Sequence, residues 1–234
     1  MALELFGLSI HEPDVVFTDF GLAILGAYLG WRLWTSLGRG TLQQAGSVLM
    51  GGLASAALWG AIFHAFFPAG TATLPGFIVW IPVALSILVV ASTLLELSLR
   101  SLAPRVPPPV RRSIVATYAV GFAAVVLLVD ESFATIVRFY VPTLVLVLVA
   151  AVQQAIRCRS AGWTLIAVGF TISAGAALGQ QVEFSIHPLY FDHNAVYHVL
   201  QGIALVVLYL GFRWATDSSV RAYASGTDSE HSQG

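Results

Sequence analysis

Seven long apolar stretches alternate with short polar segments along the chain of 234 residues. Each stretch is close to the about 20 residues that a helix needs to cross the hydrocarbon layer of a bilayer. The pattern therefore predicts an all-α protein whose membrane domain, residues 15–215, is a seven-transmembrane helix bundle. A short segment, residues 1–14, precedes this domain, and a polar tail, residues 216–234, follows it as a disordered end. The predicted spans are 15–34, 47–67, 76–99, 113–129, 133–155, 163–181 and 195–214.

Composition supports a membrane protein and excludes several functions. The chain is 57% hydrophobic and 10% charged, whereas a soluble domain carries about 25% charged residues. All 11 basic residues are arginines, so no lysine is present to form a Schiff base with retinal or pyridoxal phosphate. The net charge of −1 argues against nucleic acid as a partner. The one cysteine, Cys158, can form neither an internal disulfide nor a cysteine metal cluster.

The arginines also predict the orientation of the bundle. All except Arg138, which lies near the start of the fifth span, lie in or beside the first, third and fifth loops or the C-terminal tail. Short loops rich in arginine stay on the cytoplasmic side of a membrane. We therefore expect the N-terminus outside and the C-terminal tail in the cytoplasm, with the plasma membrane of a prokaryote as the expected location.

Polar side chains within and beside the spans gather at one depth. With the expected orientation, they belong to the outer ends of the first, second, sixth and seventh spans. The inner half of the bundle has little beyond Glu96, Gln153 and Gln154. Ionisable groups are costly at membrane depth and are a default sign of a functional site there. The outer set consists of Asp19, His64, Gln180, Gln181, Glu183, His193, Asn194, His198 and Gln201.

The start of the last span contributes the largest part of this set. On a helix, His198 shares one face with Asn194 and Gln201, which lie four residues before and three residues after it. Neutral imidazole is the commonest metal ligand, and the alternative for His198 is a buried ring that hydrogen-bonds to a neighbour. His193 can join the same site only if the helix begins at or after it, with Asp192 or Asn194 as the N-cap. Otherwise it is an interfacial residue facing water.

Three further residues are candidates for the same outer site. His64 is the only ionisable group in the second span, and its alternative role is that of a satisfied structural histidine. Asp19 could act as a general base, as an interfacial cap, or as a partner that orients a histidine, and we favour the last role. Glu183 either faces the site or ends its helix among lipid headgroups.

Two groups of charges outside this set have structural explanations. Glu96 and Arg100 are spaced for an i,i+4 ion pair at the inner end of the third span. Asp130, Glu131 and Arg138 are expected to form an ion pair in an outer loop. The alternative for Arg138 is that it holds an anionic lipid headgroup.

Two segments resemble a known superfamily, the alkaline ceramidases with the adiponectin-receptor-like proteins and the hydrolases that remodel GPI-anchor lipids. The first is Trp-Gly-Ala-Ile-Phe-His at 59–64, and the second is Asn-Ala-Val-Tyr-His-Val-Leu-Gln-Gly at 194–202. Residues 12–19 resemble the family more weakly. The layout of seven spans with an outer N-terminus is also similar.

This resemblance implies a zinc ion held by one histidine of the second span and two of the seventh, with a bound water that hydrolyses a lipid amide or ester. His64 and His198 occupy two of the ligand positions. The third ligand position, four residues before His198, holds Asn194, so His193 is the expected substitute. The family's serine, four residues before His64, is Gly60 here, and the expected aspartate of the third span is absent from the sequence.

The sequence therefore predicts a zinc-dependent hydrolase with a membrane lipid as substrate. His64, His193 and His198 are the predicted metal ligands, and Asp19 and Glu183 are the predicted acid and base groups. Zinc would lower the pKa of its bound water to about 7. The departures from the family pattern favour an alternative, a receptor or transporter with a polar outer cavity. A haem protein with axial His64 and His198 is a third class, disfavoured because the inner half of the spans contains no histidine.

Overall fold

The structure is a computed structural model that describes residues 2–5, 8–36, 40–187 and 190–231. Within the last range, side chains are described as far as Ala215. A two-stranded antiparallel hairpin, β1 (Ala2–Leu5) and β2 (Leu8–His11), stands before the helices. The helices are α1 (Pro13–Thr35), α2 (Thr41–Phe66), α3 (Leu74–Leu102), α4 (Pro108–Leu128), α5 (Phe133–Cys158), α6 (Ala161–Gln181) and α7 (His193–His231), with a 3₁₀ turn, η1 (Gly70–Ala72), before α3.

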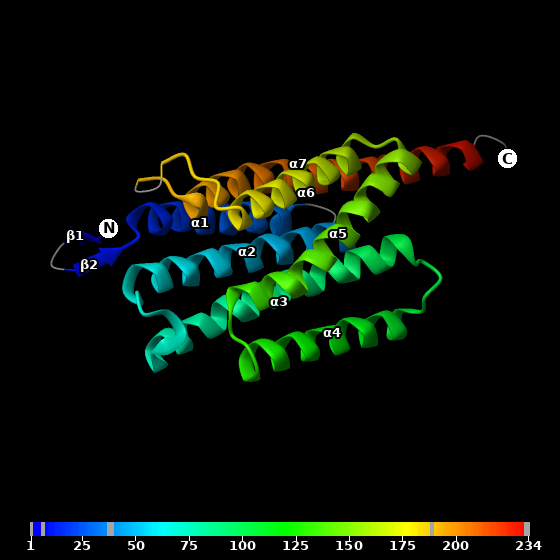
Figure 1. Ribbon diagram of the computed structural model, residues 1–234. Coiled ribbons are helices and arrows are strands. Elements are labelled where there is room, and N and C mark those ends of the chain that lie inside the picture. The colour runs from blue at the N-terminus through cyan, green and yellow to red at the C-terminus, as the bar shows by residue number, and fades with distance from the viewer. Residues whose placement is uncertain (1, 6–7, 37–39, 188–189, 232–234) are drawn as a thin grey trace.

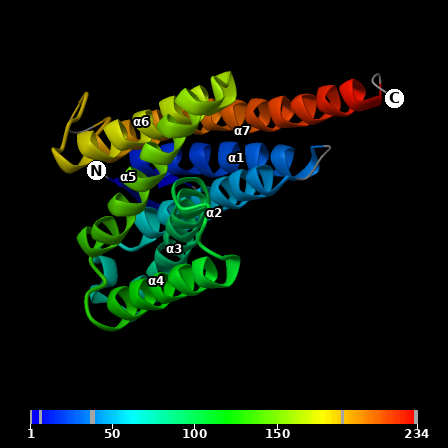
Figure 2. The ribbon, with the colours of Figure 1, turned by 90° about the vertical axis from the view of Figure 1, so that its right-hand side faces the viewer.

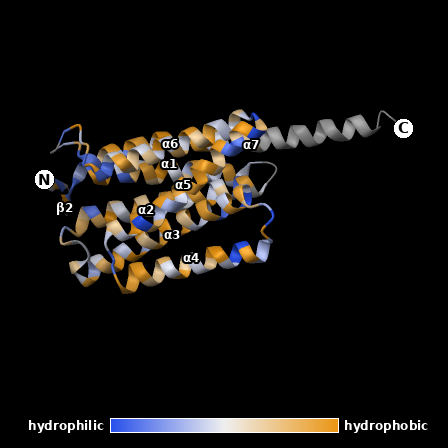
Figure 3. Cartoon of the chain, turned by 45° about the vertical axis from the view of Figure 1, so that its right-hand side comes forward, coloured by the Kyte–Doolittle hydropathy of each residue, from blue (hydrophilic) through white to orange (hydrophobic). Residues whose placement is uncertain are grey.

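The seven predicted spans are confirmed as helices. All seven are long and apolar enough to cross a membrane, so the protein is an integral, multi-pass membrane protein. Figure 3 shows apolar residues distributed over the helices of the bundle. Many of these side chains are exposed, among them Ile24 (72%), Leu128 (83%) and Ile156 (72%). Such exposure is expected where the surrounding medium is lipid rather than water.

Local sequence explains where several helices begin. Proline stands in the first turn of α1, α3 and α4, where its missing N–H would have no intrahelical partner. The side chain of Thr73 accepts a hydrogen bond from the third residue of α3, and that of Ser132 does the same at α5. Asp192 caps α7, because its Oδ1 accepts from the N–H groups of Asn194 and Ala195, both at 2.9 Å.

Six of the helices form a closed ring. In the order α1, α2, α3, α5, α6 and α7, each helix packs on the next, and α7 returns to α1. The helix α4 stands outside this ring against α3 and α5 (Figures 1 and 2). The larger buried core lies inside the ring, and a smaller one between α3, α4 and α5 contains Trp80, Phe122 and Ile136.

Close approach of α6 and α7 depends on glycine. A Cβ atom added at Gly162 would lie 2.1 Å from the backbone nitrogen of Ala215, and one at Gly169 would lie 2.6 Å from Cγ of Leu208. A Cβ at Gly211 would lie 2.8 Å from Ile166. Small residues let membrane helices pack at short distance, so this contact holds α7 at a fixed position in the ring.

Several other sequence expectations can be compared with the structure. Glu96 and Arg100 form the predicted ion pair, with 2.6 Å between Arg100 Nε and Glu96 Oε1. Among the described residues, Asp130 makes no ion pair with Arg138. Its carboxylate instead accepts hydrogen bonds from the backbone of Ser132 and the hydroxyl of Thr135, at the start of α5. Asp130 can make these bonds because Ser132 and Thr135 follow it by only two and five residues.

The helix α7 continues beyond the membrane domain to His231 (Figure 1). The expected disorder of the tail, residues 216–234, stays a prediction. Residues 232–234 lie outside the described part of the chain.

Candidate functional site

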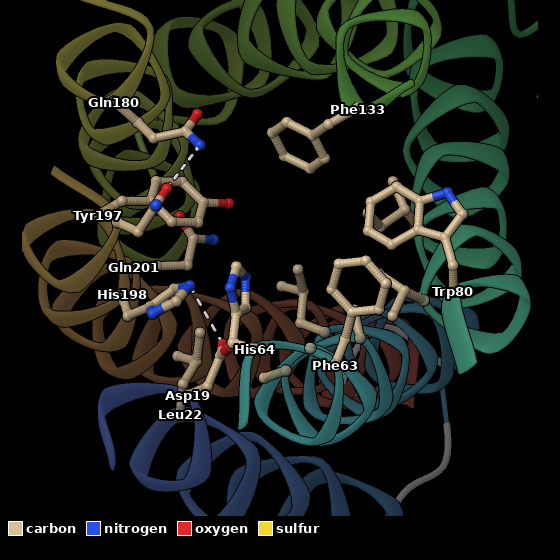
Figure 4. Close-up of a pocket in the computed structure, with 17 residues that line it drawn as sticks. Asp19, Leu22, Phe63, His64, Trp80, Phe133, Gln180, Tyr197, His198 and Gln201 are labelled. Carbon is tan, nitrogen blue, oxygen red and sulfur yellow. Dashed lines mark hydrogen bonds and ion pairs between the residues drawn. The ribbon is translucent and has the colours of Figure 1, made fainter. Parts of the chain in front are cut away.

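A pocket of about 320 Å³ lies inside the ring, near the end of the bundle where α1 and α7 begin and α2 and α6 end. Its volume is at the lower limit of the usual range for ligand sites, about 300–1,000 Å³. One side is polar and is formed by Asp19, His64, Gln180, Asn194, Tyr197, His198 and Gln201. The other side is aromatic and aliphatic, with Phe63, Trp80 and Phe133 prominent in Figure 4.

His198 lies between two side chains of α1. Its Nδ1 is 3.1 Å from the hydroxyl of Thr18, and its Nε2 is 3.1 Å from Oδ1 of Asp19. The Asp192 cap determines where α7 begins, and His198 stands in the second turn that follows. Both nitrogens of the ring are therefore engaged, and the ring cannot turn without losing a polar contact.

Asp19 is the most deeply buried carboxylate of the site, with only 3% of its surface exposed. The helix α2 approaches it closely, because a Cβ added at Gly60 would lie 3.0 Å from Asp19 Oδ2. A buried carboxylate is strongly unfavourable unless it is paired. Oδ1 of Asp19 lies 3.1 Å from Nε2 of His198, and the His64 ring lies beside the carboxylate in Figure 4.

His64 is held from outside the pocket. Its Nδ1 lies 2.6 Å from Oε2 of Glu12, the residue directly before α1. This hydrogen bond from His64 lowers the pKa of Glu12, so the carboxylate is ionised at neutral pH and accepts from Nδ1–H. In the neutral form of the ring, the second nitrogen, Nε2, carries a lone pair. Glu12 has a left-handed backbone conformation with φ of 44°, which is uncommon outside glycine.

Amide groups complete the polar side. Gln180 Nε2 donates to Asn194 Oδ1 across 3.1 Å, which joins α6 to the start of α7. Gln201 is buried, with 2% of its surface exposed. It stands one turn after His198 on the same face of α7, as the sequence predicts.

The opposite wall is a set of aromatic rings from three helices. The centroids of Phe63 and Trp80 are 5.2 Å apart, and those of Trp80 and Phe133 are 6.3 Å apart. The indole Nε1 of Trp80 donates to the carbonyl of Glu131 at 2.9 Å, which fixes the ring at the pocket edge. Such a wall favours an apolar portion of a ligand.

The structure brings three of the five predicted site residues together. Asp19, His64 and His198 all line the pocket, whereas His193 and Glu183 do not. His193 is the first residue of α7, before the turn that carries His198. Glu183 is exposed just after α6, with a left-handed φ of 55°. Within the described ranges, no group of three His, Cys, Asp or Glu side chains is placed so that it could hold a metal ion.

Sequence reasoning did not identify the two outer partners of the histidines. Thr18 contacts His198, and Glu12 contacts His64, and neither contact follows from spacing because the partners are 180 and 52 residues apart. The sequence contains one weak indication of these contacts. Glu12 and Thr18 both belong to the segment 12–19, which also contains the predicted site residue Asp19.

Comparison with known proteins identifies a family. The sequence pattern of a family of unknown function, DUF6962, matches residues 15–217, which include all seven spans. No curated protein and no solved structure shows a significant match.

Proposed function

The chain belongs to DUF6962, a family of unknown function, and we propose that this member is a zinc-dependent hydrolase of a lipid amide or ester. The proposed site is the pocket that contains Asp19, His64 and His198. The observation that carries the proposal is that each imidazole is held at Nδ1 by a partner that does not line the pocket, Glu12 or Thr18, while Nε2 of His198 faces the buried carboxylate of Asp19.

This arrangement is typical of histidines that bind metals. A ligating imidazole usually hydrogen-bonds through its other nitrogen to a carboxylate or another acceptor, which sets the tautomer. Glu12 has this position at His64, at 2.6 Å. Thr18 has it at His198, at 3.1 Å.

The hydroxyl of Thr18 adds a second argument. It lies 2.8 Å from the carbonyl oxygen of Asp14, four residues earlier, where helical threonines commonly donate. A hydroxyl has one hydrogen, so Thr18 then accepts from Nδ1–H of His198. The Nε2 lone pair of His198 is left facing the Asp19 carboxylate at 3.1 Å. Two acceptors at this distance repel each other unless a proton or a cation lies between them.

The donor set fits zinc in its chemistry, since two imidazoles and one carboxylate form catalytic zinc sites in other hydrolases. The side chains as they stand do not yet form a three-ligand group, so binding would have to draw His64 towards the pair of Asp19 and His198. When bound, zinc would supply a nucleophilic water at neutral pH. The residues themselves position the Asp19 carboxylate and orient the two imidazoles through Glu12 and Thr18.

The two sides of the pocket support a lipid as the substrate. The amide side chains of Gln180 and Gln201 can hydrogen-bond to the polar part of a lipid, and the rings of Trp80 and Phe133 can contact its apolar part. A pocket of about 320 Å³ has room for about ten waters at about 30 Å³ each. It therefore accepts the reacting linkage and adjacent carbons, and leaves long acyl chains in the bilayer.

Orientation and location belong to the same proposal. The arginines at the opposite end of the bundle support an outer position for the pocket and for the N-terminus, and a cytoplasmic position for the C-terminus. We propose the plasma membrane of a prokaryote as the location. A reporter fused to each end in turn would test the orientation.

Metal analysis of protein purified in detergent tests the proposal most directly. We expect about one zinc per chain in the unchanged protein, and its loss in both His64→Ala and His198→Ala. His193→Ala serves as the matched control and should retain zinc. Loss of zinc in His193→Ala would make that residue a ligand, as the sequence alone predicted. Unchanged zinc in His64→Ala and His198→Ala would refute the site.

Activity is measured in parallel with a lipid amide and the ester of the same acyl chain. Hydrolysis of either one that falls with zinc removal and returns on zinc addition supports the proposal. Hydrolysis that persists fully in a chelator would refute zinc dependence.

One observation favours a second function, a non-enzymatic receptor or transporter. The pocket is lined by two imidazoles rather than three, and Asn194 stands where the resembled family has a ligand. Saturable lipid binding that depends on His64 and His198, without zinc and without hydrolysis, would support this alternative.

A further inference from the structure

A second cavity, of about 520 Å³, lies at the opposite end of the bundle, between α2, α3 and α4. It is separate from the pocket described above and shares no lining residue with it. We call it the α4 groove. Its lining residues are Gln44, Ala45 and Val48 of α2, Leu88, Val89, Ser92, Thr93, Glu96, Leu97 and Arg100 of α3, and Val115 and Ala119 of α4.

The α4 groove exists because α4 is attached to the ring mainly through its second half. Its two buried residues, Phe122 and Val126, both belong to that half. In the first two-thirds of the helix, residues 108–121, every described side chain is exposed or only partly buried. Val48 and Val89 are 43% and 44% exposed on the other walls. An apolar channel therefore opens to the membrane beside α4.

The groove has a charged end with fixed geometry. Arg100 Nε donates to Glu96 Oε1 at 2.6 Å, and Arg111 Nε lies 3.8 Å from the same oxygen. Arg111 Nη1 also donates to the carbonyl of Val106 at 3.0 Å. Two guanidinium groups are thus held at one point by a single carboxylate.

Three polar atoms at this end are buried and have no hydrogen-bond partner within the described structure. They are Ser92 Oγ, Glu96 Oε2 and Arg111 Nε. A buried polar atom without a partner costs about 1–3 kcal/mol. Glu96 Oε2 is an acceptor, Arg111 Nε is a donor, and the Ser92 hydroxyl can act as both. We infer that a polar group that is not part of the chain binds among these three atoms.

The charge at this end favours an anion. Between residues 96 and 112 the chain carries four arginines, at 100, 105, 111 and 112, and one acid, Glu96. Basic pockets between helices at the arginine-rich side of a membrane bind anionic headgroups. An arginine guanidinium also matches the geometry of a phosphate.

We propose that the α4 groove binds an anionic glycerophospholipid with a hydroxyl in its headgroup. The phosphate lies against Arg100 and Arg111. The hydroxyl donates to Glu96 Oε2, and one acyl chain follows Val89 and Val115 along the groove. Binding in this position holds the first half of α4 against α3.

Native mass spectrometry of the detergent-purified protein tests the proposal, with dioleoyl phosphatidylglycerol as probe and dioleoyl phosphatidylcholine as the zwitterionic comparison. We expect phosphatidylglycerol to bind more tightly. Each arginine contributes about fivefold near an anionic headgroup, so Arg100→Gln with Arg111→Gln should weaken binding about thirtyfold. Arg157→Gln is the matched control for each single variant, Arg100→Gln or Arg111→Gln, because it removes one positive charge at an exposed site at the same end of the bundle.

A further variant separates the groove from the surface charge. Ala119→Phe places a ring in the groove and leaves every arginine in place, and it should also reduce phosphatidylglycerol binding. Retained binding in Ala119→Phe would mean that the lipid lies on the surface, and would overturn the proposal. Equal binding of the two lipids, or equal loss in the Arg157→Gln control, would overturn it as well. If the double variant fails to fold, Arg111→Gln alone should weaken phosphatidylglycerol binding about fivefold, and unchanged binding in that variant would overturn the proposal.

Discussion

Replacing Gly169 by alanine should loosen the contact between α6 and α7 and thereby disturb the helix that carries His198. The new Cβ would lie 2.6 Å from Cγ and 2.8 Å from Cδ2 of Leu208, whose surface is 1% exposed. Carbon atoms pack best at about 3.5–4.0 Å, so the contact must open by roughly 1 Å. Such overpacking costs about 1–3 kcal/mol.

Gly175 of the same helix provides the matched comparison. It is exposed, and a Cβ added there meets nothing within 4 Å. Alanine gains about 1 kcal/mol of helix propensity over glycine at either position. The difference between Gly169→Ala and Gly175→Ala therefore isolates the packing cost of about 1–3 kcal/mol.

Reversible unfolding in mixed micelles with sodium dodecyl sulfate, followed by tryptophan fluorescence, measures this difference. Gly169→Ala should be the less stable variant. Equal unfolding free energies within about 0.5 kcal/mol would show that α6 and α7 are not packed as closely as described, and would refute the reasoning.

Three further predictions concern hydrogen bonds at the ends of helices and at the site. The hydrogen bond from His64 lowers the pKa of Glu12, so ionised Glu12 stabilises the fold above its ordinary pKa of 4.5, and this stabilisation is lost as the pH falls through the lower pKa of the folded state. On acidification the melting temperature should therefore drop more in the unchanged protein than in Glu12→Gln. The same dependence of melting temperature on pH in both proteins would contradict this prediction. Thr18→Val removes the partner of His198 Nδ1 and should weaken zinc affinity about 10- to 100-fold, as a competition titration with a chelator would show; unchanged affinity would exclude this role. Ser132→Ala removes the cap of α5 and should reduce the unfolding free energy by about 1 kcal/mol, whereas Ser132→Thr, which keeps the hydroxyl, should lose little of it.

The sequence determined the helices with little ambiguity. A span must satisfy its own backbone hydrogen bonds inside lipid, so length and apolarity alone were sufficient to predict seven helices. The predicted ends differ from the observed ends mostly by a few residues. The largest difference is at the end of α7, which continues to His231 rather than ending at residue 214. The next is at α2, which begins at Thr41 rather than at residue 47, because Gln43 and Gln44 near its start are good helix formers although they are polar.

Depth was also readable from the sequence, and this explains why three of the five predicted site residues line the pocket. Residues near the same end of neighbouring spans lie at one level of the bundle, so the positions of Asp19, His64 and His198 along their spans are enough to group them. The pocket contains all three. Depth does not say which face of a helix a residue occupies, and His193 shares the level of His198 without lining the pocket.

What the tertiary structure alone decided is the pairing across helices. The order of the ring places α1 between α2 and α7, so that Glu12 meets His64 and Thr18 meets His198. The outer position of α4, which creates the groove, is equally invisible in a sequence where its hydropathy resembles that of the other spans. Lipid and protein interior are similarly apolar, and hydropathy therefore separates a helix from water but does not select its neighbours. That selection comes from the shapes of small and large side chains, which act only once the helices are side by side.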